Sequence, residues 1–238
     1  MITLQKVCNM ICVSLAEPTC DALLKRLQQV AAKADMAEVR LDALADAESL
    51  DFVSLIKDRP CPLIFTNISS AEGGLFSGSE EERISLLEKA ISAGADYVDI
   101  ELRTDPGLRD AIVKKVREAG TKLIISHHDF SRTPAKEKLI DVFDSERQAG
   151  ADIGKIVTMA ANPQDVLKVF SLYFKALDEG FPLIAFCMGP FGKMSRLACL
   201  AMGAYLTYAS PARGHEAAPG QIPLDDLRAM VDCLNDTQ

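Results

Sequence analysis

Residues 147–152 read Arg147-Gln148-Ala149-Gly150-Ala151-Asp152 and run directly into the apolar stretch 152–158, and this segment decides the fold. A similar phrase, AISAGAD at residues 90–96, precedes another apolar stretch, 97–102. Glycine ends a helix readily because it adopts the left-handed conformation, and a short run rich in Ile and Val is typical of a buried parallel strand. Each phrase therefore predicts a helix end, a turn and a buried strand.

Apolar runs of this kind alternate with segments of helical period along the whole chain. We expect strands at 9–15, 37–41, 63–67, 97–102, 122–127, 152–158, 183–187 and 205–208. We expect helices at 21–34, 80–93, 134–149, 163–177 and 224–234, with Thr133 and Asn162 as caps before the two that open on proline. About eight such units in 238 residues predict an α/β fold, with residues 1–238 forming one (β/α)8 TIM barrel domain. The alternative, an open doubly wound sheet, is disfavoured because the first strand lacks a glycine-rich phosphate turn.

Composition and charge exclude several classes of protein. The net charge of -8 argues against general nucleic-acid binding, which needs clustered basic residues. The seven cysteines are odd in number, lack a CxxC pair and lie mostly in apolar runs, which indicates reduced thiols. The histidines show no zinc-type spacing, so we expect no metal site. With neither a signal peptide nor an apolar run of membrane-spanning length, we expect a cytoplasmic protein that binds no membrane.

In a parallel barrel, catalytic groups lie at the carboxyl ends of the strands. Lys155, within the predicted strand 152–158, is the sharpest candidate. Burial lowers the pKa of a lysine and makes a neutral amine available as a nucleophile. The structural alternative is a strand-edge lysine with its amine in water, which is the commoner state of lysines.

Histidine and arginine residues follow other strands. His127 and His128 point to opposite sides of an extended strand, so at most one is expected to face the pocket and move protons. Glu38, Arg40 and Asp42 alternate along the second strand and share one face, where carboxylates can hold a guanidinium by paired hydrogen bonds.

Two further pairs have weaker signals. Asp99 and Glu101 share a face of the fourth strand, and we expect them to support the site without contacting substrate. Ser195 and Arg196 follow a glycine-rich loop at a predicted helix start, an arrangement suited to an anion. An ordinary helix start with a solvated arginine is the alternative.

Taken in order, these motifs resemble the type I 3-dehydroquinate dehydratases of the shikimate pathway, over nearly the whole chain. The matching stretches are Glu38-Val39-Arg40-Leu41-Asp42, Glu72-Gly73-Gly74, Asp99-Ile100-Glu101, Ser126-His127-His128-Asp129-Phe130, Lys155, Met188-Gly189 to Ser195-Arg196-Leu197, and Ala218-Pro219-Gly220-Gln221. Each motif is weak alone, and the ordered set is specific.

The resemblance implies a lyase of aromatic amino acid biosynthesis that uses no cofactor. Lys155 would form a Schiff base with 3-dehydroquinate, His128 would carry protons, and Glu72 would orient His128. Glu38 and Arg40 would bind ring hydroxyls, and Arg196 and Gln221 would bind the carboxylate, with Gln221 on a loop that can close. Family members often pair, so a homodimer is possible, and some lineages fuse this domain to shikimate dehydrogenase.

Two residues depart from the family pattern. Ile68 stands where the family usually has Arg, and Ala217 stands where it often has Ser. Each change removes a substrate contact, and a charge-assisted hydrogen bond contributes about 1.5–3 kcal/mol. Two alternatives follow: a class I aldolase-like lyase acting on another small oxo-acid through Lys155, or a non-catalytic relative that binds a carboxylate.

Overall fold

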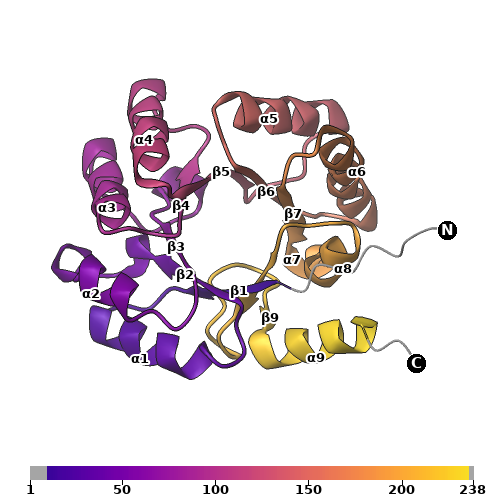
Figure 1. The fold of residues 1–238 in the computed structure, drawn as a ribbon. Helices are drawn as coiled ribbons and strands as arrows, with labels where there is room; N and C mark the ends of the chain where they lie inside the picture. Colours follow the sequence, from indigo (N-terminus) through magenta and orange to yellow (C-terminus); the bar gives the residue numbers. More distant parts are fainter. Residues whose placement is uncertain (1–9, 236–238) are drawn as a thin grey trace.

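The structure is a computed structural model that describes residues 10–235. One parallel sheet has the strand order β7-β6-β5-β4-β3-β2-β1-β8-β9. The strands are β1 (Ile11–Leu15), β2 (Met36–Arg40), β3 (Leu63–Thr66), β4 (Tyr97–Glu101), β5 (Lys122–Asp129), β6 (Ile153–Met159), β7 (Leu183–Met188), β8 (Thr207–Ser210) and β9 (Ile222–Pro223). Figure 1 shows the strands as a ring surrounded by helices, which confirms the predicted TIM barrel class.

The helices connect successive strands around the outside of the ring. They are α1 (Cys20–Val30), α2 (Phe52–Lys57), α3 (Glu80–Ser92), α4 (Pro106–Ala119), α5 (Lys136–Gln148), α6 (Pro163–Glu179), α7 (Gly189–Gly192), α8 (Ser195–Ala201) and α9 (Leu224–Asn235). Two short 3-10 turns, Leu41–Ala43 and Ser70–Glu72, follow β2 and β3 and carry site residues. No helix in the part of the chain that the structure describes is long and apolar enough to cross a membrane.

The predicted strands are confirmed within one or two residues, except that Asn9 lies outside the described residues. Asn162 caps α6 as predicted, by accepting a hydrogen bond from Asp165 N. The prediction for Thr133 was wrong, because its hydroxyl lies 2.8 Å from Thr158 Oγ1 and 2.8 Å from Met159 O of the next strand. The helix therefore begins only at Lys136, after Ala135, without a side-chain cap.

The ring closes between β7 and β8 without a β-ladder among the described residues. Tyr205 N donates to Leu183 O at 2.8 Å just before β8. Above that bond, the rings of Phe186 and Tyr208 lie 6.2 Å apart, centroid to centroid. Side chains thus complete the wall of the barrel where backbone pairing is missing, and both aromatic residues also line the pocket.

Candidate active site

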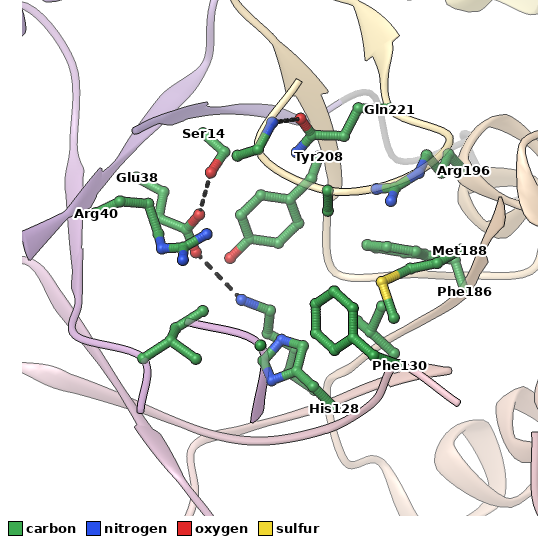
Figure 2. Close-up of a pocket in the computed structure, with 16 residues that line it drawn as sticks. Ser14, Glu38, Arg40, His128, Phe130, Phe186, Met188, Arg196, Tyr208 and Gln221 are labelled. Carbon is green, nitrogen blue, oxygen red and sulfur yellow. Dashed lines mark hydrogen bonds and ion pairs between the residues drawn. The ribbon is translucent and has the colours of Figure 1, made fainter. Parts of the chain in front are cut away.

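A pocket with an empty volume of about 450 Å³, measured out to its mouth, opens at the carboxyl ends of the strands. Figure 2 draws the 16 residues that line it. They include Lys155, His128, Glu38, Arg40, Arg196 and Gln221, six of the seven residues that the sequence assigned to the site. Glu72 lies behind His128, outside the lining.

Lys155 is buried at the centre of the barrel, with 4% of its surface exposed. Its Nζ lies 2.7 Å from Asp99 Oδ2 and 3.2 Å from Glu38 Oε1. Burial acts to lower the pKa of Lys155, but the two carboxylates outweigh it and hold the pKa above its ordinary value. The expected fall in the pKa of Lys155 was therefore wrong for the ligand-free state, because the sequence did not place Asp99 against the amine.

Glu38 joins several polar side chains on the same wall. It accepts hydrogen bonds from Ser14 Oγ at 2.5 Å and from Thr66 Oγ1 at 3.1 Å. Burial acts to raise the pKa of Glu38, but the charges of Lys155 and Arg40 and the bond from Ser14 bring it down to about 2. Glu38 is thus an anion at neutral pH.

Arg40 and Asp42 form the bidentate pair that the sequence predicted. Arg40 Nε donates to Asp42 Oδ1 at 2.8 Å, and Arg40 Nη2 donates to Asp42 Oδ2 at 2.6 Å. Asp42 lies on the turn after β2, and its Oδ2 also accepts from Leu75 N at 3.0 Å. Asp42 therefore fixes both the guanidinium and the loop that follows β3.

His128 and Glu72 lie in direct contact. Glu72 Oε2 is 3.1 Å from His128 Nδ1 and accepts the backbone N–H of His128 at 3.0 Å. These two bonds fix the ring so that His128 faces the pocket (Figure 2). His127 is absent from the described lining, and burial lowers its pKa. One histidine of the pair faces the pocket, as the alternation predicted.

Glu101 supports the loop that carries Glu72. It pairs with Arg83 at 2.8 Å and accepts the hydroxyl of Ser69 at 2.8 Å, just before the Ser70–Glu72 turn. The expectation of a supporting role agrees with these contacts. The same expectation was incomplete for Asp99, which contacts Lys155 directly.

Arg196 is a buried cation without a carboxylate partner among the residues that the structure describes. Its guanidinium lies 4.6 Å from the ring centroid of Phe186, and Nη2 donates to Pro219 O at 3.2 Å. Burial lowers the pKa of Arg196 to about 10, so it remains charged at neutral pH. Ser195 instead holds the backbone of β7, by accepting from Cys187 N at 2.8 Å.

Gln221 ends the loop between β8 and β9. Its Oε1 accepts the backbone N–H of Ala217 at 2.7 Å, which leaves the amide nitrogen available to a ligand. Gly189 N donates to Pro219 O at 3.3 Å and so ties this loop to the end of β7. Both departures from the family pattern, Ile68 and Ala217, line the pocket.

The sequence did not single out Ser14, Phe130 or Tyr208, which also line the pocket. Ser14 and Tyr208 follow the alternation of β1 and β8, so the period of those strands was a usable signal. The described residues contain no group of three or more His, Cys, Asp or Glu that could hold a metal ion. The six cysteines that the structure describes are unpaired thiols.

Comparisons with known proteins agree with this geometry. A profile of the family described as Type I 3-dehydroquinase matches residues 11–238. The 3-dehydroquinate dehydratase of Desulfotalea psychrophila is 42% identical over 221 residues, which cover 92% of this chain and 96% of that protein. The crystal structure of the 3-dehydroquinate dehydratase of Geobacillus kaustophilus has a TM-score of 0.86 at 30% identity, over 95% of this chain and 91% of that one. The type I enzyme of Clostridium difficile, solved with covalent modified comenic acid, has a TM-score of 0.85 at 28% identity, over 95% and 92% of the two chains. The chain therefore belongs to the type I 3-dehydroquinase family, the hydro-lyases of the shikimate pathway.

Proposed function

We propose that this protein dehydrates 3-dehydroquinate to 3-dehydroshikimate through an imine on Lys155. One observation carries the proposal: a buried lysine, an oriented histidine and an unpaired arginine line the same pocket. They supply a nucleophile for a ketone, a group that moves protons and a partner for a carboxylate. The family membership selects the substrate.

Imine formation begins when the ammonium of Lys155 loses a proton, and Asp99, at 2.7 Å, is the nearest acceptor. The amine attacks the ketone carbon to give a carbinolamine, and the proton held on Asp99 moves to the departing hydroxyl, so that water leaves, a protonated imine forms and Asp99 is again an anion. This cation attracts electrons and makes the neighbouring C–H acidic. Glu38 and Asp99 flank the nitrogen throughout and stabilise its positive charge.

Elimination then requires a single base that also acts as an acid. His128 removes the proton from the carbon next to the imine, and the electron pair moves into the imine to form an enamine. The enamine expels the hydroxyl, which takes a proton from His128 and leaves as water. Hydrolysis of the product imine restores the Lys155 amine. Glu72 holds the ring of His128 in place and stabilises the imidazolium between the two transfers.

Substrate orientation comes from the two ends of the pocket. Arg196 binds the carboxylate together with the amide nitrogen of Gln221, which the loop brings over the mouth. Glu38 accepts hydrogen bonds from the ring hydroxyls, and Arg40 donates hydrogen bonds to them. Ile68 and Ala217 offer no side-chain hydrogen bond, so fewer charged groups hold the hydroxyl side than in most of the family.

The proposal is tested by intact mass after incubation with 3-dehydroquinate and sodium borohydride, which reduces an imine to a stable amine. We expect one adduct in the wild type, no adduct in Lys155→Ala and an unchanged adduct in Lys114→Ala, whose amine is exposed on α4. His128→Asn should form the adduct but turn over at least about a hundredfold more slowly. Substrate that stabilises the wild type without forming an adduct would instead indicate a non-catalytic carboxylate binder.

A further inference from the structure

Tyr208 of β8 places an unused hydroxyl inside the pocket. The residue lines the site and is 3% exposed. Its hydroxyl oxygen is buried and has no partner in hydrogen-bond geometry among the described residues, although the carboxylate of Glu38 lies close enough to affect its pKa. Its ring lies over Lys155, with Nζ 4.4 Å from the ring centroid. The mechanism described above does not use this side chain.

A buried hydroxyl without a hydrogen-bond partner destabilises the folded protein. A protein can retain such a group in a pocket where a bound ligand supplies the missing partner. Burial raises the pKa of the Tyr208 hydroxyl, and the charge of Glu38 adds to this effect. The phenol therefore stays protonated at neutral pH, so that it can act as a donor.

The position of Tyr208 indicates which part of the substrate it meets. β8 pairs with β1, with Tyr208 opposite Cys12, and Ser14 of β1 bonds Glu38. Figure 2 shows Tyr208 pointing into the pocket from the same side as Ser14 and Glu38. The phenol thus approaches the region between Lys155 and Glu38, where the carbon beside the imine and its hydroxyl must lie.

We infer that Tyr208 is a substrate-binding residue whose hydroxyl donates a hydrogen bond to the ring hydroxyl next to the ketone. That ring hydroxyl donates one hydrogen bond to Glu38, and its oxygen lone pairs can accept a second hydrogen bond from Tyr208. Tyr208 then provides a hydrogen-bond donor in a pocket where the side chain of Ile68 provides none. The inference rests on the proposed function, because it takes the substrate and its attachment to Lys155 from there.

Tyr208→Phe tests the inference because it keeps the ring over Lys155 and removes only the hydroxyl. We expect kcat/KM to fall about three- to tenfold, the range for a neutral hydrogen bond of roughly 0.5–1.5 kcal/mol, mostly through a higher KM. The borohydride adduct should still form at saturating substrate. The ligand-free variant should unfold at the same or a higher temperature, since it no longer buries an unpartnered hydroxyl.

Tyr97→Phe is the matched control, because its hydroxyl lies 2.7 Å from that of Tyr205 and outside the described lining of the pocket. This control should lower thermal stability and leave kcat/KM unchanged. A purely structural Tyr208 would behave like the control, and that result would overturn the inference. An unchanged KM in Tyr208→Phe, with a wild-type adduct present, overturns the inference alone. A wild type that forms no adduct overturns the proposed function as well.

Discussion

The charges of single side chains set the resting state of this pocket. Lys155 is an ammonium held between Asp99 and Glu38. These ion pairs raise the pKa of Lys155 and lower the pKa of Glu38. Lys155 can lose its proton only if these ion pairs rearrange, because the two carboxylates stabilise its charged form.

The low pKa of Glu38 predicts a loss of stability in acid. Its pKa moves from an ordinary 4.5 down to about 2, so this carboxylate stabilises the fold above its ordinary pKa. That contribution disappears as the pH falls from about 4.5 to about 2. We expect Glu38→Gln to be less stable at neutral pH by roughly 3 kcal/mol, the cost of removing one partner of a buried ion pair. Urea midpoints should show the difference between wild type and variant shrinking through that acid window; a difference independent of pH would contradict the account.

The buried carboxyl of Glu146 predicts that the stability of the fold decreases as the pH rises. Its carboxylate is fully buried on α5 behind β6, and neither oxygen has a hydrogen-bond partner among the described residues. Gly154 makes room for it, since a Cβ there would lie 2.6 Å from Glu146 Oε2. Burial raises the pKa of Glu146, so the protonated form stabilises the fold at low pH and this contribution is lost as the pH rises through the raised pKa.

Glu146→Gln keeps the shape and removes the titration. We expect the variant to gain stability relative to the wild type as the pH rises from about 5 to about 9, because only the wild type must ionise a buried acid. Chemical denaturation across this range measures the difference. Parallel pH profiles for the two proteins would show that Glu146 does not titrate in the folded state.

At the scale of elements, the loop between β8 and β9 contributes Ala217, Ala218 and Gln221 to the lining of the pocket. It is tied to the end of β7 through Gly189 and Pro219, and its outer side lies near α1, with His215 Nε2 3.4 Å from Arg26 Nη2. Gly220 has a φ of +80°, and a Cβ there would lie 2.8 Å from Gly189 O. A side chain at this position must therefore move the loop and Gln221 with it.

Gly220→Ala should raise KM about tenfold with a small change in kcat, because it displaces Gln221 but leaves Lys155 and His128 in place. Gly214→Ala is the matched control: it has a φ of +79° in the same loop, and a Cβ there meets nothing within 4 Å. Both variants carry the strain of a left-handed alanine, of order 1 kcal/mol, but only the first has the clash. Steady-state kinetics on the pair separates the two effects, and equal KM values would exclude loop displacement.

Elements also show where reading the sequence succeeds and where it stops. The helix ends at Gly94 and Gly150 were predictable because glycine adopts a positive φ more easily than other residues, and both glycines have one. The sequence could not show that Thr133 fails to cap the helix, because its hydroxyl instead contacts a hydroxyl 25 residues away on β6. The helix α4 has a clear start, with Asp105 accepting from Gly107 N at 2.8 Å, but only Ile112 and Val116 are buried, so its apolar stripe was too narrow to detect.

At the scale of the whole molecule, the barrel collects residues from distant strands at one end. Lys155, His128, Glu38 and Arg40 were identified because polar side chains at strand ends are unusual. Tyr208 and Ser14 were not identified, since tyrosine and serine are ordinary residues in strands, although the alternation of β8 and β1 directs both side chains to the pocket. The partner of Lys155 also depended on register, because Asp99 comes from two strands away.

The incomplete pairing at the β7–β8 seam predicts where the barrel opens first. β5 and β6 have ladders on both sides, whereas β7 has a ladder only with β6 and, among the described residues, meets β8 through one backbone bond before the strand and an aromatic contact. Peptides from β7 should exchange amide hydrogens sooner than peptides from β5 and β6 under native conditions. Hydrogen exchange read by mass spectrometry tests this order, and protection that is uniform around the ring would refute it.

The unpaired guanidinium of Arg196 has a practical consequence for anyone handling the protein. Arg196 has no carboxylate partner among residues 10–235, so we expect sulfate, phosphate or citrate in a buffer to bind beside its guanidinium in the pocket. Such salts will raise the melting temperature of the resting protein and compete with substrate at the same time. Activity measured in phosphate should therefore be lower than activity measured in a buffer of bulky amines. A screen of melting temperature alone would select the buffers that inhibit the protein.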